Sequence, residues 1–286
     1  MKQDFYVRNP YPMVGNHNDY YDRDLRPVFE SLAPRAVLDA GCGTGALTRD
    51  IARHFPAASV TAVDASEPSI RLARERHGDL ANVTFGVVDL EQHVPGRAPG
   101  FDFVFCQGVL HHLQRPDLAL RNLHAASTDD MTAYVWLYSE HGRHEIAMVR
   151  ELEHLLAGPG RSDEERLSTI ELLRPLFHDL FEADAHDLKD WVSPGSDWTL
   201  TDEHRARQVD RYLNPLAKHY SVRSANDLFT AAGFEIVSVP TLDGVQLPPA
   251  VLDMASRQPD LINRYVVAEL VARPGGIGYL LRKCHR

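Results

Sequence analysis

Apolar runs of strand length alternate with helical patterns through the first half of the chain. The runs cover residues 36–38, 59–63, 83–88, 101–106 and 133–138. Between them, apolar residues recur at helical spacing over 47–55, 68–76 and 117–126. Strands that are apolar at consecutive positions are typical of a sheet buried on both faces. The alternation therefore predicts an α/β fold with a doubly wound, mostly parallel sheet.

The second half of the chain begins with a long helical pattern and returns to strands only near its end. Between residues 140 and 220 no strand-like run occurs, and apolar residues recur at helical spacing. After it we expect a helix over 224–232, a strand over 234–239, a helix near 261–271 and a strand over 277–281. The predicted sheet then has seven strands.

These patterns divide the chain into four parts. Residues 1–34 carry an N-terminal aromatic arm and a leading helix over 19–32, and residues 35–139 form a central core. Residues 140–221 form a helical insertion after the fifth strand, and residues 222–286 complete the core sheet. We expect the insertion to act as a lid that sets specificity, because segments added to a scaffold usually do so.

The charge balance narrows the classes of partner. The formal net charge is -10, from 40 acidic and 30 basic residues. This balance disfavours a nucleic acid or an anionic membrane and favours a small-molecule substrate. The three cysteines are widely spaced, which indicates neither a zinc site nor a disulfide framework. Since no apolar stretch has the length of a signal peptide or a spanning helix, we expect a cytoplasmic protein, either a monomer or a homodimer.

A glycine-rich loop follows the first predicted strand. Asp39 ends that strand, and Gly41, Gly43 and Gly45 follow before the next helix. Glycine lets a backbone approach a ligand closely, and the amides that open the helix face an anionic group. The loop alone also fits a relaxed nicotinamide or flavin pattern, so a Rossmann oxidoreductase is one alternative.

Polar side chains also follow the next three predicted strands. Asp64 ends the second strand, Asp89 follows the third, and Gln107 follows the fourth and opens the run 107–113. Ligands of open α/β sheets bind at the carboxyl ends of the strands. We therefore expect these side chains to share one ligand-binding edge.

In order and spacing, these segments resemble class I S-adenosylmethionine-dependent methyltransferases with a Rossmann-like core. The matching residues are 37–45, 63–64, 89, and 101–105 leading into 109–113. The resemblance covers residues 35–137 well and the last three predicted elements loosely. It implies a final strand antiparallel to the rest, S-adenosylmethionine as cofactor and S-adenosylhomocysteine as product. Family members usually carry a Pro-Gly-Gly-type turn before the fifth strand, and residues 127–131 imply a different turn here.

The resemblance gives each polar residue at this edge a part of the cofactor. Asp39 meets the amino group of the methionine end, and the loop amides meet its carboxylate. Asp64 accepts hydrogen bonds from the two ribose hydroxyls. Asp89 accepts one from the adenine amine, and Ala65 and Leu90 flank the adenine ring.

Three residues after the fourth strand are candidates near the transferred methyl group, namely Gln107, His111 and His112. Imidazole has an ordinary pKa suited to a general base that activates a hydroxyl or an amine. Adjacent residues on a helix point about 100° apart, so at most one histidine serves as base. The alternative is that both pack structurally and that proximity alone drives the transfer.

Aromatic residues supply the remaining candidates. Tyr21 is expected to reach the methionine end of the cofactor, and Tyr6 and Tyr11 to contact a substrate. Trp136 and Tyr138, at the end of the fifth strand, are expected in the pocket wall. The alternative for the arm is plain packing on the leading helix.

We therefore expect direct in-line transfer of a methyl group to an oxygen, nitrogen or carbon atom of a small molecule. Besides the oxidoreductase, the other alternative is a non-methylating relative that binds the same cofactor. No metal is expected, because the histidines around position 144 fit a solvated helix face.

Overall fold

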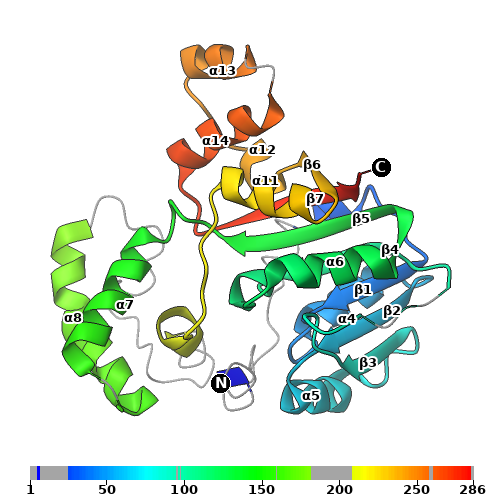
Figure 1. Ribbon diagram of the computed structural model, residues 1–286, viewed down its shortest axis with the longest axis horizontal. Helices are drawn as coiled ribbons and strands as arrows, with labels where there is room; N and C mark the ends of the chain where they lie inside the picture. The colour runs from blue at the N-terminus through cyan, green and yellow to red at the C-terminus, as the bar shows by residue number, and fades with distance from the viewer. Residues whose placement is uncertain are drawn as a thin grey trace.

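The structure is a computed structural model of the chain and describes residues 5–6, 25–94, 96, 98–158, 160–181, 208–257 and 260–284 (Figure 1). Its centre is a seven-stranded sheet in the order β3-β2-β1-β4-β5-β7-β6. The strands are β1 (Ala36–Ala40), β2 (Ser59–Asp64), β3 (Val83–Val87), β4 (Phe101–Gln107), β5 (Ser127–Tyr138), β6 (Phe234–Ser238) and β7 (Gly276–Lys283).

The directions of the strands confirm the predicted fold class. β1 pairs in parallel with β2 and β4, as do β2 with β3 and β4 with β5. β7 is antiparallel to both of its neighbours, β5 and β6. The sheet is therefore mostly parallel, with only its final strand reversed.

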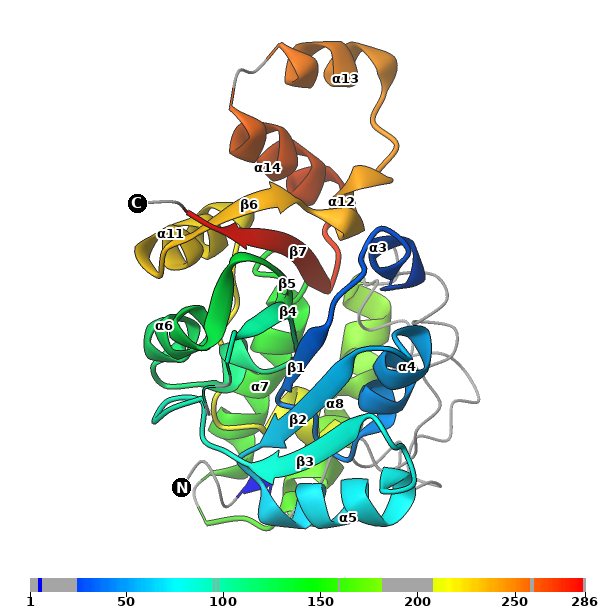
Figure 2. The same cartoon turned by 90° about the vertical axis from the view of Figure 1, so that its right-hand side faces the viewer.

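Helices cover both faces of the sheet. Figure 2 shows α3 and α4 on one face and α6 and α11 on the other. All five residues of β1 are buried, and consecutive ones serve opposite faces: Val37 packs with Phe29 of α3, and Leu38 with Leu120 of α6. The helices are α3 (Arg26–Phe29), α4 (Ala46–His54), α5 (Glu67–His77), α6 (Pro116–Ala126), α7 (His144–Ala157), α8 (Asp163–Phe181), α11 (Val222–Ala231), α12 (Pro240–Asp243), α13 (Pro249–Ser256) and α14 (Leu261–Ala272), with a 3-10 helix η2 (Leu110–His112) and a π-helix η3 (Val209–Leu213).

Two elements differ from their predicted bounds. The leading helix, predicted over 19–32, already ends at Phe29 as α3, and residues 19–24 lie outside the described part. The amide of Leu32 donates to the carbonyl of Phe29 at 2.9 Å, and the hydroxyl of Ser31 to that of Val28 at 2.9 Å, which closes the helix with a tight turn.

The fifth strand begins at Ser127, where a turn was predicted. Phe101 pairs with Ser127 but Phe103 pairs with Thr132, so extended residues of β5 bulge out of register. The carbonyl of Ser127 accepts a hydrogen bond of 2.7 Å from the ammonium group of Lys283. A bulged strand start therefore replaces the turn that the resemblance implies.

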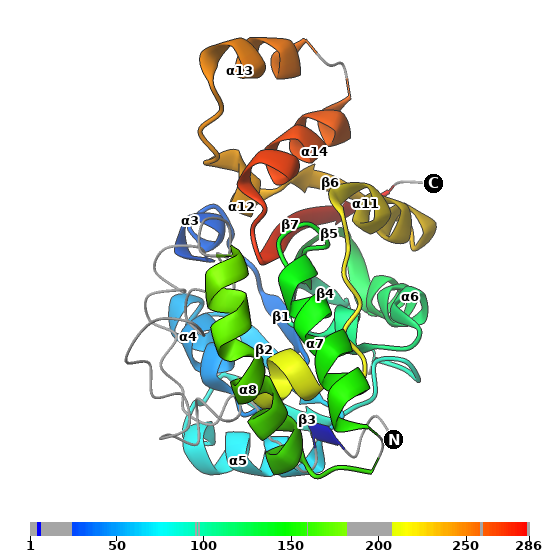
Figure 3. The same cartoon turned by 90° about the vertical axis from the view of Figure 1, so that its left-hand side faces the viewer.

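The segment predicted as a helical insertion is helical where it is described and lies across the carboxyl edge of the sheet (Figure 3). α7, α8 and η3 share a small core of their own, with Ile146, Ile170 and Tyr212 among its buried members. Phe5, from the N-terminal arm, belongs to this core as well. The insertion is thus joined to the start of the chain. Within the described residues, every helix is too short or too polar to cross a membrane.

Candidate functional site

The glycine loop lies at the carboxyl end of β1, in the middle of the sheet. Gly41, Gly43 and Gly45 all have positive φ, at 87°, 55° and 83°, which glycine adopts far more readily than other residues. A Cβ atom on Gly41 would lie 2.2 Å from Cγ2 of Val109. The loop is fixed to β2, because the amides of Gly41 and Cys42 donate to the carbonyl of Val63 at 2.7 and 2.9 Å.

Asp39 is a buried carboxyl group just ahead of the loop. Its side chain is 3% exposed, and Oδ2 accepts a hydrogen bond of 2.6 Å from the hydroxyl of Thr48 on α4. Burial and, to a smaller extent, the nearby carboxylate of Asp64 raise the pKa of Asp39 from 3.8 to about 7, while the hydrogen bond from Thr48 acts in the opposite direction. A group with this pKa binds a proton or an external cation near neutral pH.

Asp64 holds the loop in shape. Its Oδ2 accepts from the amide of Gly43 at 3.0 Å and its Oδ1 from the amide of Ser66 at 2.8 Å. Burial raises the pKa of Asp64, while these two amides act in the opposite direction. Each carboxylate oxygen has two acceptor positions, so one per oxygen is left for a ligand.

The three residues predicted around an adenine ring differ from one another in burial and contacts. Asp89 accepts from the amide of Glu91 at 2.9 Å and from the side chain of Gln92 at 3.1 Å. Ala65 is half-buried beside Asp64. Leu90 is 4% exposed and belongs to the hydrophobic core on the α6 face of the sheet.

Gln107 ends β4 with an unsatisfied buried atom. Asp39 of β1 pairs with Phe105 of β4. Gln107 is two residues further along β4, so it lies at the end of the strand, beside the glycine loop. Its Oε1 is buried and has no hydrogen-bond partner. A buried acceptor without a donor costs about 1 to 3 kcal/mol, and such atoms are rare in folded proteins. Gln107 therefore indicates a ligand that carries a hydrogen-bond donor.

His111 and His112 lie in the 3-10 helix η2 rather than in an α-helix, and their rings contact each other with centroids 4.2 Å apart. His111 stacks on the ring of Tyr138 at 3.7 Å, and Nδ1 accepts from the amide of Tyr138 at 3.3 Å. His112 contacts the carbonyl of Leu216 through Nδ1 at 2.7 Å. Burial lowers the pKa of both imidazoles, so both are neutral at neutral pH.

These hydrogen bonds assign the proton on each neutral ring. The Nδ1 atom of His111 is an acceptor, so Nε2 carries the proton, and this Nε2 is buried with no partner. The Nδ1 atom of His112 lies 2.7 Å from the carbonyl oxygen of Leu216 and 3.1 Å from Nδ2 of Asn214. The nearer carbonyl can only accept, so Nδ1 carries the proton and Nε2 has the free lone pair. That Nε2 lies 3.9 Å from the carboxylate of Asp210.

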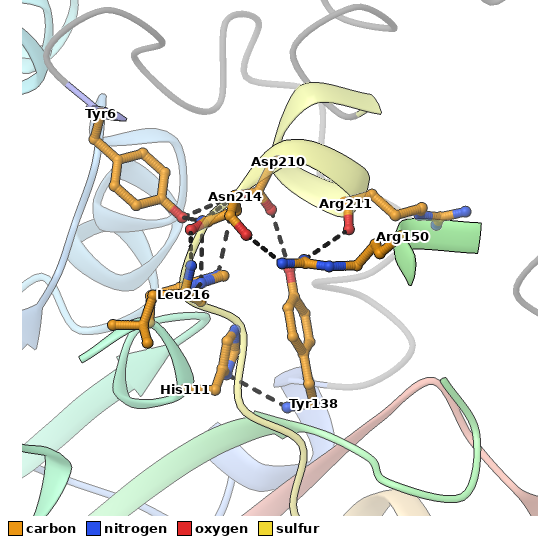
Figure 4. Close-up of polar contacts among 9 residues, drawn as sticks. Tyr6, His111, Tyr138, Arg150, Asp210, Arg211, Asn214 and Leu216 are labelled. Atoms are coloured by element: carbon orange, nitrogen blue, oxygen red, sulfur yellow. Dashed lines mark hydrogen bonds and ion pairs between the residues drawn. The ribbon is translucent and has the colours of Figure 1, made fainter. Parts of the chain in front are cut away.

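Asp210 joins three separate segments (Figure 4). Its Oδ1 accepts from the hydroxyl of Tyr6 at 2.7 Å and from Nδ2 of Asn214 at 3.2 Å, and its Oδ2 accepts from the hydroxyl of Tyr138 at 3.0 Å. Burial raises the pKa of Tyr6 most, and the negative charge of Asp210 is the second cause that raises it. The arm, the end of β5 and the insertion therefore meet at one carboxylate.

Three other aromatic residues were predicted near the ligand. Tyr11 and Tyr21 lie outside the described residues. Trp136 is half-buried, and a Cβ atom on Gly276 of β7 would lie 1.8 Å from its ring. Trp136 thus packs against the neighbouring strand, and its ring also makes edge contacts with the rings of His111 and Tyr138, at centroid distances of 5.8 and 5.5 Å. Among the described residues, His141 and His144 gather no set of three or more side chains able to hold a metal ion.

Sequence reasoning missed Asp210, Asn214 and Arg150. Arg150 donates to the carbonyls of Arg211, at 3.4 Å, and Asn214. These residues lie in the insertion, where no strand end marks a ligand site. The signal in the sequence was the polar pair Asp210 and Asn214, which are spaced by one helical turn.

The geometry agrees with what the chain resembles among known proteins. A family model described as a methyltransferase domain matches residues 37–129. A malonyl-[acyl-carrier protein] O-methyltransferase of Halalkalibacterium halodurans is 38% identical over 85 residues, 29% of this chain and 31% of the relative. A trans-aconitate 2-methyltransferase of Rhodopseudomonas palustris is 30% identical over 200 residues, 60% of this chain and 75% of the relative. The chain spans only 31% of the length of the malonyl-[acyl-carrier protein] O-methyltransferase, and 31% and 40% of the length of two further relatives.

A solved structure shares the fold. PKMT2 from Rickettsia typhi, in complex with AdoHcy, is 18% identical with a TM-score of 0.70, over 88% of this chain and 49% of that one. The relative from Rhodopseudomonas palustris is 30% identical and is matched over three quarters of its length. The chain belongs to the class I S-adenosylmethionine-dependent methyltransferase superfamily.

Proposed function

We propose that this protein transfers the methyl group of S-adenosylmethionine to an oxygen, nitrogen or carbon atom of a small molecule. The observation that carries the proposal is a pair of buried acceptors beside the glycine loop. Asp39 has a pKa of about 7, and Oε1 of Gln107 has no donor. A ligand with a cationic amino group satisfies both, and the methionine end of this cofactor carries one.

The described residues fit the rest of the cofactor in the following way. The amides of the first turn of α4, which begins at Ala46, face the methionine carboxylate. Asp64 accepts from the ribose hydroxyls at the acceptor positions that Gly43 and Ser66 leave open. Asp89 accepts from the adenine amine. Tyr21, proposed for the methionine end, lies outside the described residues.

When bound, the cofactor supplies an electrophilic methyl group on a sulfonium. The residues of the chain then orient the acceptor atom, exclude water and accept a proton where the acceptor carries one. His112 is the proposed proton acceptor, because Nε2 has the free lone pair and faces Asp210 at 3.9 Å. His111 is proposed as a donor to the substrate, because its Nε2 carries a proton and has no partner.

The insertion over 140–221 is proposed as a cover that selects the substrate. Support comes from Tyr6 and Tyr138, which join the arm and β5 to Asp210 of the insertion. Two relatives are named as methyltransferases of trans-aconitate and of malonyl-acyl-carrier protein, and the first of these acceptors is a small molecule.

The proposal is tested by calorimetry followed by a transfer assay. We expect S-adenosylmethionine and S-adenosylhomocysteine to bind and NAD not to bind, whereas binding of NAD alone would indicate an oxidoreductase. Radiolabelled methyl transfer to a pool of metabolites is then measured. Binding without any transfer would indicate a non-methylating relative and contradict the proposal.

A further inference from the structure

Arg143 is a buried cation at the start of the insertion. It precedes the first turn of α7 and is 6% exposed. Its Nε is buried with no hydrogen-bond partner, and no carboxylate of the described residues forms an ion pair with its guanidinium group. Arginine is rarely buried without an anion, so this group lacks the partner that its chemistry requires.

The ring of Tyr138 offsets only part of this cost. The central carbon of the guanidinium group lies 3.6 Å from the ring centre, a cation–π contact worth about 2 kcal/mol when desolvated. Removing a cation from water costs several kcal/mol even after the protein relaxes. The remaining cost indicates that an anion is missing from the surroundings of Arg143.

The neighbouring groups do not supply that anion. The two oxygens of Asp210 already accept from Tyr6, Asn214 and Tyr138. Arg150 adds a second positive charge and donates only to backbone carbonyls. Two guanidinium groups and the carboxylate of Asp210 therefore lie around Tyr138, which leaves this part of the molecule with an excess positive charge.

The pKa values of the three histidines around Tyr138 are also affected by the positive charge of Arg143. Burial is the largest cause that lowers the pKa of His111, His112 and His219, and the charge of Arg143 lowers each of them further. The pKa of His219 falls to about 4. These neutral rings contribute no anion and no competing cation.

We propose that Arg143 binds a carboxylate of the methyl-acceptor substrate. The planar guanidinium group offers Nε together with one terminal nitrogen as a fork that matches the two oxygens of a carboxylate. This proposal rests on the proposed function, because it names the substrate class of the same site.

The position of Arg143 favours the substrate over the methionine carboxylate of the cofactor. His111 and Arg143 both lie within 3.7 Å of the centre of the Tyr138 ring, so they occupy its opposite faces. Arg143 follows β5, and β5 is separated from β1 and its glycine loop by β4, about 10 Å across two strand spacings. In the proposed function, the amides of the first turn of α4 already serve the cofactor carboxylate.

The test measures binding of two carboxylates and their uncharged amides by calorimetry. The probes are succinate against succinamide and benzoate against benzamide, each titrated into protein with and without S-adenosylhomocysteine. We expect at least one carboxylate to bind wild type more tightly than its amide. In Arg143→Gln this carboxylate should bind at least tenfold more weakly, since a charge-assisted hydrogen bond is lost, while S-adenosylhomocysteine binds within twofold of wild type.

Two further variants separate charge from structure. Arg143→Lys keeps the positive charge and should retain part of the carboxylate binding. Arg161→Gln removes a charge from the same insertion, where Arg161 pairs with Glu165 on the surface, and should leave the binding unchanged. The affinity for S-adenosylhomocysteine also reports whether each variant folds.

Three outcomes would overturn the proposal. In the first, neither carboxylate binds wild type better than its amide. In the second, Arg143→Gln and Arg161→Gln weaken the carboxylate equally. In the third, Arg143→Gln loses S-adenosylhomocysteine while it keeps the carboxylate, which would assign Arg143 to the cofactor. If wild type binds no S-adenosylhomocysteine, the proposed function fails, yet loss of carboxylate binding in Arg143→Gln without that ligand still supports the anion site.

Discussion

At the scale of single residues, the buried carboxyl group of Asp39 makes stability depend on pH. Its pKa is about 7 in the folded chain and near 4 in the unfolded chain, so the folded state binds more protons between these values. The free energy of unfolding therefore falls as pH rises from about 4 to about 7, and the loss caused by this group stays constant at higher pH. The loss is on the order of 2 to 4 kcal/mol.

We predict that Asp39→Asn removes this dependence. The amide oxygen still accepts from Thr48, and no charge is buried. The variant should match wild type at pH 4 and exceed it by on the order of 2 to 4 kcal/mol at pH 8, as measured by urea denaturation at both pH values. Parallel pH profiles of the two proteins would contradict the assignment.

The same substitution should weaken binding of the proposed cofactor. A carboxylate beside the cationic amino group is lost, so Asp39→Asn is expected to bind S-adenosylhomocysteine about tenfold more weakly at pH 8. At pH 5.5 the wild-type carboxyl is protonated and the two proteins should differ less. Calorimetry at both pH values gives the ratio, and a ratio that does not grow with pH would argue against contact between Asp39 and the amino group.

The two histidines should differ in turnover. His112→Gln removes the free lone pair that faces Asp210, and we expect turnover to fall by about a hundredfold. His111→Gln keeps a donor group and should lose less. Since burial lowers the pKa of His112, wild-type activity should persist below pH 6.5, the ordinary value for histidine. If neither substitution lowers turnover, proximity alone accounts for the reaction.

At the scale of elements, the glycine loop is held by close packing on η2. Gly41→Ala combines left-handed backbone strain of about 1 to 2 kcal/mol with a contact at 2.2 Å to Val109, which adds about 1 to 3 kcal/mol. We expect the free energy of unfolding to fall by roughly 2 to 5 kcal/mol.

The control for this prediction is Gly108→Ala. Gly108 has a φ of 72° and open space where a Cβ atom would lie, so only the strain should appear. In the double variant Gly41→Ala with Val109→Ala, the clash is removed and part of the loss should return. Equal losses for Gly41→Ala and Gly108→Ala would show that packing on Val109 contributes nothing.

The elements that sequence predicted best are those with both faces buried. β1 and β4 are apolar at successive positions and covered on each side, so one run defines each strand. The start of β5 was missed because Asp129 and Asp130 are exposed residues in a bulge that only the pairing with β4 and β7 determines. Local pattern cannot reveal a strand that its neighbours hold in place.

Some residues of the candidate site could likewise be predicted from the sequence, and others could not. Asp39, Asp64 and Gln107 could be predicted because strand ends of a parallel sheet share one edge, although their contacts with a ligand stay predictions. Arg143 and Asp210 could not, because their meeting at Tyr138 depends on how the insertion folds back over the sheet. No spacing along the chain encodes that contact.

At the scale of the whole molecule, Asp210 links the arm, the sheet and the insertion. We predict that Tyr6→Phe and Tyr138→Phe each lower the free energy of unfolding by about 1.5 to 3 kcal/mol, since each removes a hydrogen bond to a charged group. In an Asp210→Ala background both effects should shrink. A double-mutant cycle by chemical denaturation measures the coupling, and fully additive losses would show that the three segments do not depend on one another.

The placement of β7 between β5 and β6 bears on how the polypeptide is made. β7 emerges from the ribosome only after the insertion, β6, α12, α13 and α14, yet it completes the pairing of β5. Until then the nascent chain presents one open flank of β5, a template for pairing with other chains. Efficient production of this protein would accordingly depend on keeping that flank shielded during translation, and slow elongation after β5 would prolong the vulnerable interval.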